Sequence, residues 1–155
     1  MKTIKLTQGK ETLVDDGDYE YLSKWKWCYH SGYALGYIQN KVTRKYNKVY
    51  IHRVIMGVKK GQEIDHKDGD KLNNQKSNLR MATRSENNMN RGIPKNNKSG
   101  YKGVSWSKSH KRWKAEIKVN RKYMFLGRFT NKVDAAKAYN EAAKKYFGEF
   151  RNSRK

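Results

Sequence analysis

Alternation of apolar and polar residues predicts short β-strands along most of this chain. The clearest case lies in the last third, where Trp113, Ala115, Ile117 and Val119 alternate with Arg112, Lys114, Glu116 and Lys118. A period of two predicts a strand with one apolar face and one mostly basic face. Strands are also expected at 101–106 and 123–129, the second after a short hairpin turn at Asn120-Arg121. We expect these three strands to form an antiparallel sheet.

A helical repeat follows the predicted sheet. Apolar residues recur at helical spacing after the last strand, namely Val133, Ala136, Tyr139, Ala143 and Tyr146. Thr130 or Asn131 is suited to cap the start of this helix, and Gly148 is suited to end it. Because one helix covers one face of the sheet, the other face is expected to stay open. The open face would carry Arg112, Lys114 and Lys118, with Tyr123 and Phe125 beside them.

The first half of the chain has weaker patterns. They predict short strands near 3–7 and 12–14, and an aromatic-rich hairpin of strands at 25–29 and 33–38. A brief helix capped by Asp15-Asp16 is expected between the two pairs. Residues 49–57 then predict a strand that runs into a short helix ended by Gly57. The aromatic side chains of this half are expected in the core rather than stacked on bases.

The central stretch, residues 64–88, combines turn residues with side chains able to do chemistry. Asp65-His66 end a short apolar run, so both are expected at the end of a strand that faces a turn. Asp68-Gly69-Asp70 provide that turn, and residues 78–82 predict a second strand. Thr83-Arg84-Ser85-Glu86 fits a capping box, which opens a helix. The predicted order is strand, loop, strand, helix.

A metal cation and a general base held by these residues would together suit phosphodiester hydrolysis. Mg²⁺ prefers hard oxygen ligands and keeps several waters, so one carboxylate and one amide oxygen are a sufficient share for the protein. Asp65 and Asn87 could supply these two oxygens. His66 could take a proton from an attacking water, and Asn78 could order the loop. A polar turn without catalytic function would contain the same residue types, so the spacing alone leaves both interpretations open.

The charge of the chain indicates a polyanionic partner. The 155 residues include 36 Lys and Arg against 14 Asp and Glu, a formal net charge of +22. Residues 1–92 hold 18 basic and 10 acidic side chains, whereas residues 93–155 hold 18 and 4. Such a field favours nucleic acid. Cys28 is the single cysteine, which excludes a disulfide within the chain and a Cys-rich zinc site. No long apolar run occurs, so we expect an intracellular protein without a membrane span.

Residues 51–92 resemble the HNH endonucleases of the phage and intron-homing type, whose core is a ββα-metal fold. The resemblance is carried by Ile51-His52-Arg53-Val54-Ile55-Met56, Asp65-His66-Lys67-Asp68-Gly69, Asn78-Leu79-Arg80 and Asn87. It implies His66 as the general base and Asp65 and Asn87 as metal ligands. It also implies Asn78 as the residue that orders the loop. Many members have His where this chain has Asn87, which favours Mg²⁺ or Mn²⁺ over a softer metal.

Three other residues of this stretch have weaker signals. Arg53 and Arg80 are candidates for contacts with phosphate groups. His52 is expected to be a packed, hydrogen-bonded residue beside the site, because the base and metal positions of the family are already filled.

Residues 99–152 resemble an AP2 DNA-binding domain. The resemblance is carried by Tyr101-Lys102-Gly103-Val104, Trp113-Lys114-Ala115-Glu116-Ile117, Phe125-Leu126-Gly127-Arg128-Phe129 and the Ala-rich helix. It implies that the sheet binds DNA, with matching contact positions at Lys102, Arg112, Lys118, Tyr123 and Phe125. Ser105 and Ser107 stand where plant members place Arg, and Phe125 replaces a Trp. Base specificity therefore does not carry over.

We expect an α+β protein of two parts. An HNH nuclease domain at 1–90, with small N-terminal strands and a ββα-metal core at about 49–90, is joined by a basic linker at 91–100 to an AP2-like domain at 101–155. The predicted function is metal-dependent cleavage of double-stranded DNA by a phage or mobile-element homing endonuclease, with no obligatory protein partner. The alternative is a non-catalytic DNA-binding protein or regulator with a degenerate core, and RNA binding is a third interpretation.

Overall fold

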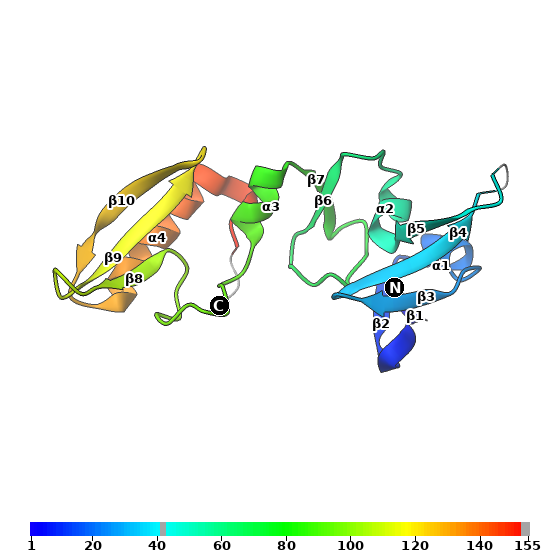
Figure 1. The fold of residues 1–155 in the computed structure, drawn as a ribbon, viewed down its shortest axis with the longest axis horizontal. Coiled ribbons are helices and arrows are strands. Elements are labelled where there is room, and N and C mark those ends of the chain that lie inside the picture. Colours follow the sequence, from blue (N-terminus) through cyan, green and yellow to red (C-terminus); the bar gives the residue numbers. More distant parts are fainter. Residues whose placement is uncertain (41–42, 153–155) are drawn as a thin grey trace. The chain divides into compact units, whose positions relative to one another are not determined.

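The computed structural model describes residues 1–40 and 43–152 and shows the expected α+β composition, with several small antiparallel sheets (Figure 1). The chain forms two compact units, Met1–Arg84 and Ser85–Lys155. This division falls six residues before the predicted linker at 91–100. Each unit is described by itself.

The first unit begins with two antiparallel sheets that enclose a small core. Its elements are β1 (Lys2–Lys5), the 3-10 turn η1 (Thr7–Gly9), β2 (Glu11–Val14), α1 (Asp16–Leu22), β3 (Trp27–His30), β4 (Tyr33–Gln39) and β5 (Tyr46–Tyr50). β1 pairs with β2, and β4 lies between β3 and β5. The core contains Leu22, Trp27, Ala34 and Ile51. The Trp27 indole N–H donates to the Leu22 carbonyl oxygen at 2.8 Å, so the polar atom of this large core residue is satisfied.

The second part of this unit contains the predicted strand, loop and strand. After α2 (Ile51–Met56), which Gly57 ends with a φ of +60°, β6 (Glu63–His66) pairs antiparallel with β7 (Leu79–Ala82). The long loop between β6 and β7 also docks on β2, because the Leu13 N–H donates to the Leu72 carbonyl and the Asn74 N–H donates to the Leu13 carbonyl. The N-terminal hairpin thus supports the loop that follows His66.

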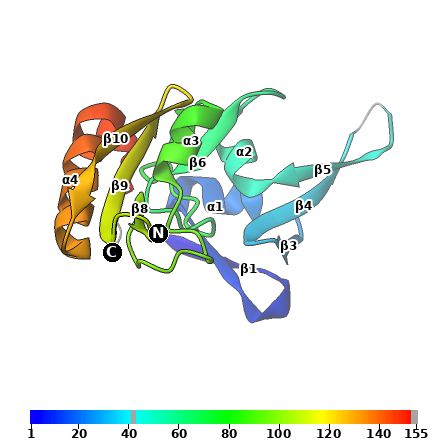
Figure 2. The ribbon, with the colours of Figure 1, turned by 60° about the vertical axis from the view of Figure 1, so that its left-hand side comes forward.

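The second unit is a three-stranded sheet with one helix packed on it. Its elements are α3 (Arg84–Asn90), β8 (Val104–Ser107), β9 (Arg112–Val119), β10 (Lys122–Phe129), α4 (Lys132–Phe147) and the 3-10 turn η2 (Gly148–Phe150), with α3 starting at the last residue of the first unit. The strand order is β10-β9-β8, and α4 covers one face of this sheet (Figures 1 and 2). Val104, Ala115, Ile117, Ala135 and Tyr139 are buried between sheet and helix.

Local chemistry explains where the elements of the second unit begin. Of the two predicted caps for α4, Asn131 is the one used: its side-chain oxygen accepts the Val133 N–H at 2.9 Å. β8, the first strand of this sheet, begins at Val104, whereas the sequence pattern predicts that it begins at residue 101. Gly103 adopts a φ of +70° just before it, and a Cβ at this position would meet the Tyr139 ring and the Glu116 carbonyl oxygen. The backbone at Gly103 therefore packs closely against α4, and β8 begins only after it.

Residues 91–100 make ordered contacts within the second unit. The Asn97 side chain donates to the Tyr101 carbonyl at 2.9 Å and accepts from the Gly100 N–H and the Ser99 hydroxyl. The segment predicted as a linker is thus folded onto the start of the sheet domain.

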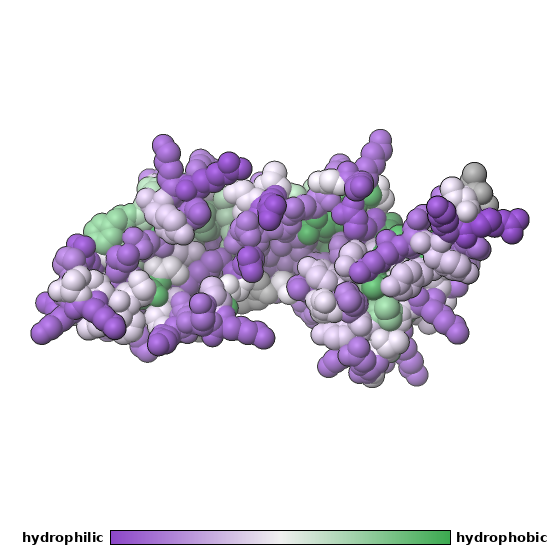
Figure 3. All heavy atoms as spheres, in the orientation of Figure 1, coloured by the Kyte–Doolittle hydropathy of each residue, from purple (hydrophilic) through white to green (hydrophobic). Residues whose placement is uncertain are grey.

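Hydrophilic side chains cover most of the surface seen in Figure 3. Across residues 1–40 and 43–152, none of the helices is long and apolar enough to cross a membrane.

Candidate active site and nucleic-acid interface

The β6–β7 pair places Asp65 and His66 at the start of the long loop. Asp65 lies opposite Arg80 in the register and His66 lies opposite Leu79. Both residues are buried, with 7% and 6% of their surfaces exposed. The loop closes immediately after them, because the Lys67 N–H donates to the Asn78 carbonyl at 2.9 Å. Two ionisable groups are therefore held in a protected position at a strand end.

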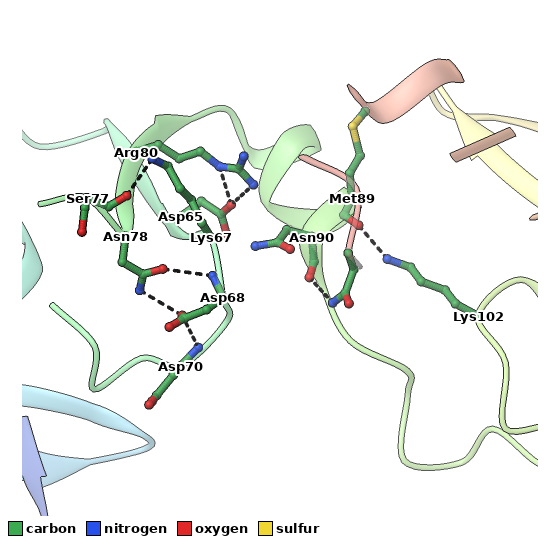
Figure 4. A network of polar contacts seen from close by, with 11 residues as sticks. Asp65, Lys67, Asp68, Asp70, Ser77, Asn78, Arg80, Met89, Asn90 and Lys102 are labelled. Carbon is green, nitrogen blue, oxygen red and sulfur yellow. Dashed lines mark hydrogen bonds and ion pairs between the residues drawn. The ribbon is translucent and has the colours of Figure 1, made fainter. Parts of the chain in front are cut away.

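Asn78 fixes the loop between the two strands (Figure 4). Its Oδ1 accepts the Asp68 N–H at 3.0 Å, and its Nδ2 donates to Asp68 Oδ1 at 2.9 Å and to the Asn73 carbonyl at 2.8 Å. Burial raises the pKa of Asp68, but the hydrogen bonds from Asn73, Asn78 and the Asp70 N–H outweigh it, so this pKa lies below its ordinary value. One buried amide thus satisfies three groups of the turn and stabilises an ionised carboxylate within it.

His66 forms a hydrogen bond with Asn74, a residue for which the sequence pattern indicates only a turn. Its Nε2 lies 3.2 Å from Oδ1 of Asn74, whose Nδ2 donates to the Thr12 hydroxyl at 2.7 Å. Asn74 and Thr12 are completely buried. The consecutive Asn73-Asn74 pair is typical of a turn, and nothing in the sequence pattern indicates contact with a residue 62 positions earlier.

Aromatic rings also contact His66 and its neighbour His52. The His52 ring lies edge-on at 5.2 Å between centroids, the Tyr33 ring lies at 6.2 Å, and Tyr50 stacks on His52 at 5.6 Å. The sequence predicts that His52 is packed and hydrogen-bonded. It is packed, but no residue in the described part of the chain is hydrogen-bonded to its buried Nδ1. The rings of Tyr33, Tyr50 and His66 pack around this imidazole.

Burial keeps both imidazoles in the neutral form. Desolvation lowers the pKa of His52 from 6.5 to about 3, and the nearby His66 and Arg53 act in the same direction. Desolvation also lowers the pKa of His66, although the hydrogen bond to Asn74 and the Asp68, Asp65 and Asp70 carboxylates oppose the shift. An imidazole that is neutral near pH 7 is able to accept a proton.

The two arginines predicted to contact phosphates both have partners within the first unit. Arg80 donates from Nε at 2.9 Å and from Nη2 at 2.6 Å to Asp65 Oδ2. Arg53 donates to the Gln62 and Lys59 carbonyls, both at 2.7 Å, and so fixes the turn between α2 and β6. The guanidinium groups therefore have structural functions here, and Arg80 brings a positive charge to the predicted metal ligand.

The donor set predicted for a metal is one carboxylate and one amide. Asp65 lies near the end of the β6 strand, and Asn87 lies in α3, within the second unit. Among the described residues, no three His, Cys, Asp or Glu side chains are grouped so that they could hold a metal ion. A site with a single carboxylate and a single amide would not form such a group, and it suits an ion that keeps most of its waters.

The uncovered face of the second unit carries basic and aromatic side chains. Arg112, Lys114 and Lys118 lie on one face of β9, and Tyr123 and Phe125 of β10 are 70% and 54% exposed. The Lys118 ammonium lies 4.9 Å from the Tyr123 ring centroid. Lys114 also forms an ion pair with Glu116 at 2.7 Å, which reduces the net positive charge of this face. This set, together with Arg128, is called the open face below.

Arg128 belongs to the open face because of a β-bulge. Strict alternation would place it on the side of the helix. A register shift between Phe125 and Gly127 instead pairs Arg128 with Lys114, and its guanidinium lies 4.9 Å from the Phe125 ring. Gly127, with a φ of +137°, is the available signal, since glycine within a strand often marks a bulge.

Lys102 lies apart from the open face. Its ammonium donates to the Met89 carbonyl oxygen (Figure 4) and to the Arg91 carbonyl oxygen, both at 2.7 Å. These carbonyls lie at the end of α3, where a cation is favourable. The structure thus gives Lys102 a function in joining α3 to the sheet domain.

Comparisons with known proteins show the family of this chain. The family model described as HNH endonuclease matches residues 49–89. Protein 3.8 of Escherichia phage T7 is 47% identical over 60 residues, which are 39% of this chain and 50% of that protein. A protein of Acanthamoeba polyphaga mimivirus, named as an uncharacterized HNH endonuclease, is 31% identical over 148 residues, 94% of this chain and 76% of that protein. The chain therefore belongs to the HNH endonuclease family.

Proposed function

We propose that this protein is a metal-dependent endonuclease that hydrolyses phosphodiester bonds in double-stranded DNA, and that it acts as a homing endonuclease of a phage or other mobile element. The observation that carries the proposal is His66: it is buried, adjacent in sequence to Asp65, and held by hydrogen bonds at the start of a locked loop. Family membership and the charge of +22 support a nucleic-acid substrate.

His66 acts as the general base in this proposal. Its lowered pKa keeps the ring neutral near pH 7, so it can take the proton of an attacking water. Asn78 contributes by ordering the loop rather than by touching the substrate, since its three hydrogen bonds all lie within residues 68–78. The strand end and the locked loop together fix the direction of the base.

Asp65 and Asn87 would hold the divalent cation, Mg²⁺ or Mn²⁺. Asp65 fits this function because its Oδ2 already accepts two hydrogen bonds from the Arg80 guanidinium, so this oxygen faces a positive charge. When bound, such an ion stabilises negative charge on the scissile phosphate and on the leaving oxygen. Arg80 would share the Asp65 carboxylate or turn toward the phosphate.

The second unit is proposed to be an AP2-like domain that binds DNA through the open face. Arg112, Lys114 and Lys118 provide charge, and the exposed Tyr123 and Phe125 provide stacking or base-edge contacts. A two-stranded ribbon such as β9–β10 fits the width of the major groove. Lys102, Arg53 and Arg80 are secondary in this proposal because backbone carbonyls or Asp65 already bind their charged groups.

One observation favours a second function, a DNA-binding protein that does not cut. Arg80 neutralises Asp65, the only carboxylate of the proposed ligand pair. A protein that retained this ion pair in the presence of metal would bind DNA through the open face without hydrolysis. Cleavage assays separate the two functions.

The test is the conversion of supercoiled plasmid by wild type and His66→Ala in Mg²⁺, in Mn²⁺ and in EDTA. We expect metal-dependent open circles for wild type and a rate lower by about 10²- to 10⁴-fold for the variant. Binding of both proteins to the same DNA, measured by fluorescence anisotropy, should be equal. Wild-type cleavage in EDTA, or equal cleavage by His66→Ala, would contradict the proposal.

A further inference from the structure

A chain of hydrogen bonds connects His66 to the N-terminal hairpin. The Thr12 hydroxyl donates to the Leu72 carbonyl at 2.7 Å and accepts from Asn74 Nδ2 at 2.7 Å. Asn74 Oδ1 lies 3.2 Å from His66 Nε2. Thr12 and Asn74 have no exposed surface, although both carry polar side chains. Burial of polar groups is costly unless each is hydrogen-bonded, and here each is.

The partners determine which way the Asn74 amide points. Its Nδ2 faces the Thr12 hydroxyl oxygen and, at 3.3 Å, the Lys71 carbonyl. The hydroxyl has donated its proton to the Leu72 carbonyl, so both neighbours need a donor. A rotated amide would place an oxygen against two acceptors. Oδ1 therefore faces His66, and since an amide oxygen only accepts, Nε2 of His66 must donate.

We propose that Asn74 and Thr12 are positioning residues that fix the tautomer and orientation of His66. The hydrogen bond from Nε2 to Asn74 leaves the lone pair of the neutral ring on Nδ1, which makes Nδ1 the atom that receives the proton. Thr12 acts through Asn74. This inference rests on the proposed function for its catalytic consequence, but the tautomer itself is a property of the folded protein.

The surrounding backbone supports a rigid connection. β2 and the loop exchange two hydrogen bonds, from the Leu13 N–H to Leu72 and from the Asn74 N–H to Leu13. Further along the loop, the Lys76 N–H donates to Asp15 Oδ2 at 2.8 Å. The contacts of His66 with His52 and Tyr33 are ring contacts, which do not select a tautomer. The hydrogen bond with Asn74 does distinguish the two ring nitrogens.

The experiment compares Thr12→Val, which keeps the shape but removes the hydroxyl, with Thr12→Ser, which restores the hydroxyl. Thr3→Val is the matched control, because Thr3 lies exposed on the paired strand opposite Leu13. Nitrogen-15 spectra of the histidine-labelled 155-residue chain at pH 8 report which ring nitrogen of His66 is protonated, and His66→Ala identifies its signals. Plasmid cleavage over a range of DNA concentrations gives kcat and KM for the same samples.

In wild type we expect His66 with Nε2 protonated. In Thr12→Val we expect a measurable fraction of the other tautomer and a kcat lower by about 10- to 100-fold with KM unchanged. Thr12→Ser and Thr3→Val should behave like wild type. Loss of folding in Thr12→Val would be seen in its amide spectrum, and Asn74→Ala then provides the same comparison at the other member of the chain.

Two results would overturn the inference: a folded Thr12→Val with unchanged His66 spectrum and kcat, or a Thr12→Ser as impaired as Thr12→Val. Failure of wild type to cut DNA would contradict the proposed function instead. The tautomer measurement decides the positioning inference in that case too.

Discussion

Both units of this protein have an apolar core, but they differ in the polar side chains that they bury. Among the described residues, the first unit buries Thr12, His52, Asp65, His66, Asn74 and Asn78, whereas the second unit buries Asn90 and Ser99. The second unit buries Val104, Ala115, Ile117 and the apolar face of α4, and keeps its charged groups on the surface of the sheet. Buried polar groups are costly unless each is hydrogen-bonded in one particular geometry. A unit with an apolar core, in contrast, tolerates substitutions on its exposed surface.

This difference separates chemistry from affinity. In the proposed function, the base is His66, whose desolvated environment lowers its pKa and whose hydrogen bond to Asn74 holds its ring. Attraction to phosphates requires only charge at an accessible surface, which the open face supplies. Substitutions in the first unit should therefore affect rate and stability together, and substitutions on the open face should affect binding alone.

The largest effect is expected for Asp65→Ala. It removes the proposed metal ligand and also the carboxylate that accepts two hydrogen bonds from Arg80. We expect cleavage to fall by at least about 100-fold and stability to fall by about 2–4 kcal/mol, because breaking a largely buried ion pair leaves a charge uncompensated. Plasmid cleavage and urea unfolding measure the two effects. The double variant Asp65→Leu with Arg80→Leu should regain stability without regaining cleavage, and recovery of cleavage would contradict the ligand assignment.

The next effect concerns the open face. Replacing Arg112, Lys114 and Lys118 together by Gln should weaken DNA binding and lower the slope of log Kobs against log salt by about 0.9 for each phosphate that is no longer neutralised. Anisotropy titrations over a series of salt concentrations measure this slope. The matched control replaces Lys137, Lys144 and Lys145, which are exposed on α4, and removes the same charge. Equal slopes for the two triple variants would exclude the open face as the main binding surface.

Gly103→Ala tests the core of the second unit. The added Cβ would meet the Tyr139 ring and the Glu116 carbonyl at a backbone φ of +70°. We expect the free energy of unfolding to fall by at least about 2 kcal/mol, because of steric conflict and backbone strain. Hydrogen exchange should show weakened protection in β9 and α4, while β4 and β6 in the first unit keep theirs. Unchanged protection in β9 would mean that the Tyr139 ring moves without cost.

A smaller and graded effect is expected from pH. The pKa of His52 is about 3 when folded against 6.5 as its ordinary value, so the unfolded chain binds more protons between these values. The contribution of His52 to the free energy of unfolding is therefore fully present above pH 6.5. It is lost as the pH falls from 6.5 toward 3, by about 1.4 kcal/mol for each pH unit. The neighbouring His66 and Arg53 also lower the pKa of His52. Urea unfolding of wild type and His52→Phe checks this, and equal pH dependence in both would contradict it.

Much of the fold could be predicted from the sequence because its signals are local. Alternation identifies β9, helical spacing identifies α4, and the turn at Asn120-Arg121 has the positive φ values of a tight hairpin. Alternation alone does not predict the late start of β8 or the place of Arg128. They depend on the contact of Gly103 with Tyr139 and on a bulge at Gly127, which alternation does not encode.

The candidate site divides in the same way. The positions of Asp65 and His66 at a strand end and of Asn78 in the loop follow from residue types and spacing. The partners of His66 do not: Asn74 lies among several turn residues, and Thr12 belongs to a different hairpin. The ion pair of Asp65 with Arg80 could not be predicted because one particular cross-strand register brings them together. Long-range polar contacts are therefore the part that required the structure.

The most direct measurement determines the single-turnover cleavage rate at saturating protein, together with the dissociation constant, for three proteins on one DNA. These are wild type, His66→Ala, and the variant with Gln at 112, 114 and 118. The division between the units predicts that His66→Ala binds like wild type and does not cut, and that the open-face variant binds weakly but cuts at the wild-type rate once saturated. A saturated open-face variant that cuts slowly, or a His66→Ala that cuts normally, would contradict this division.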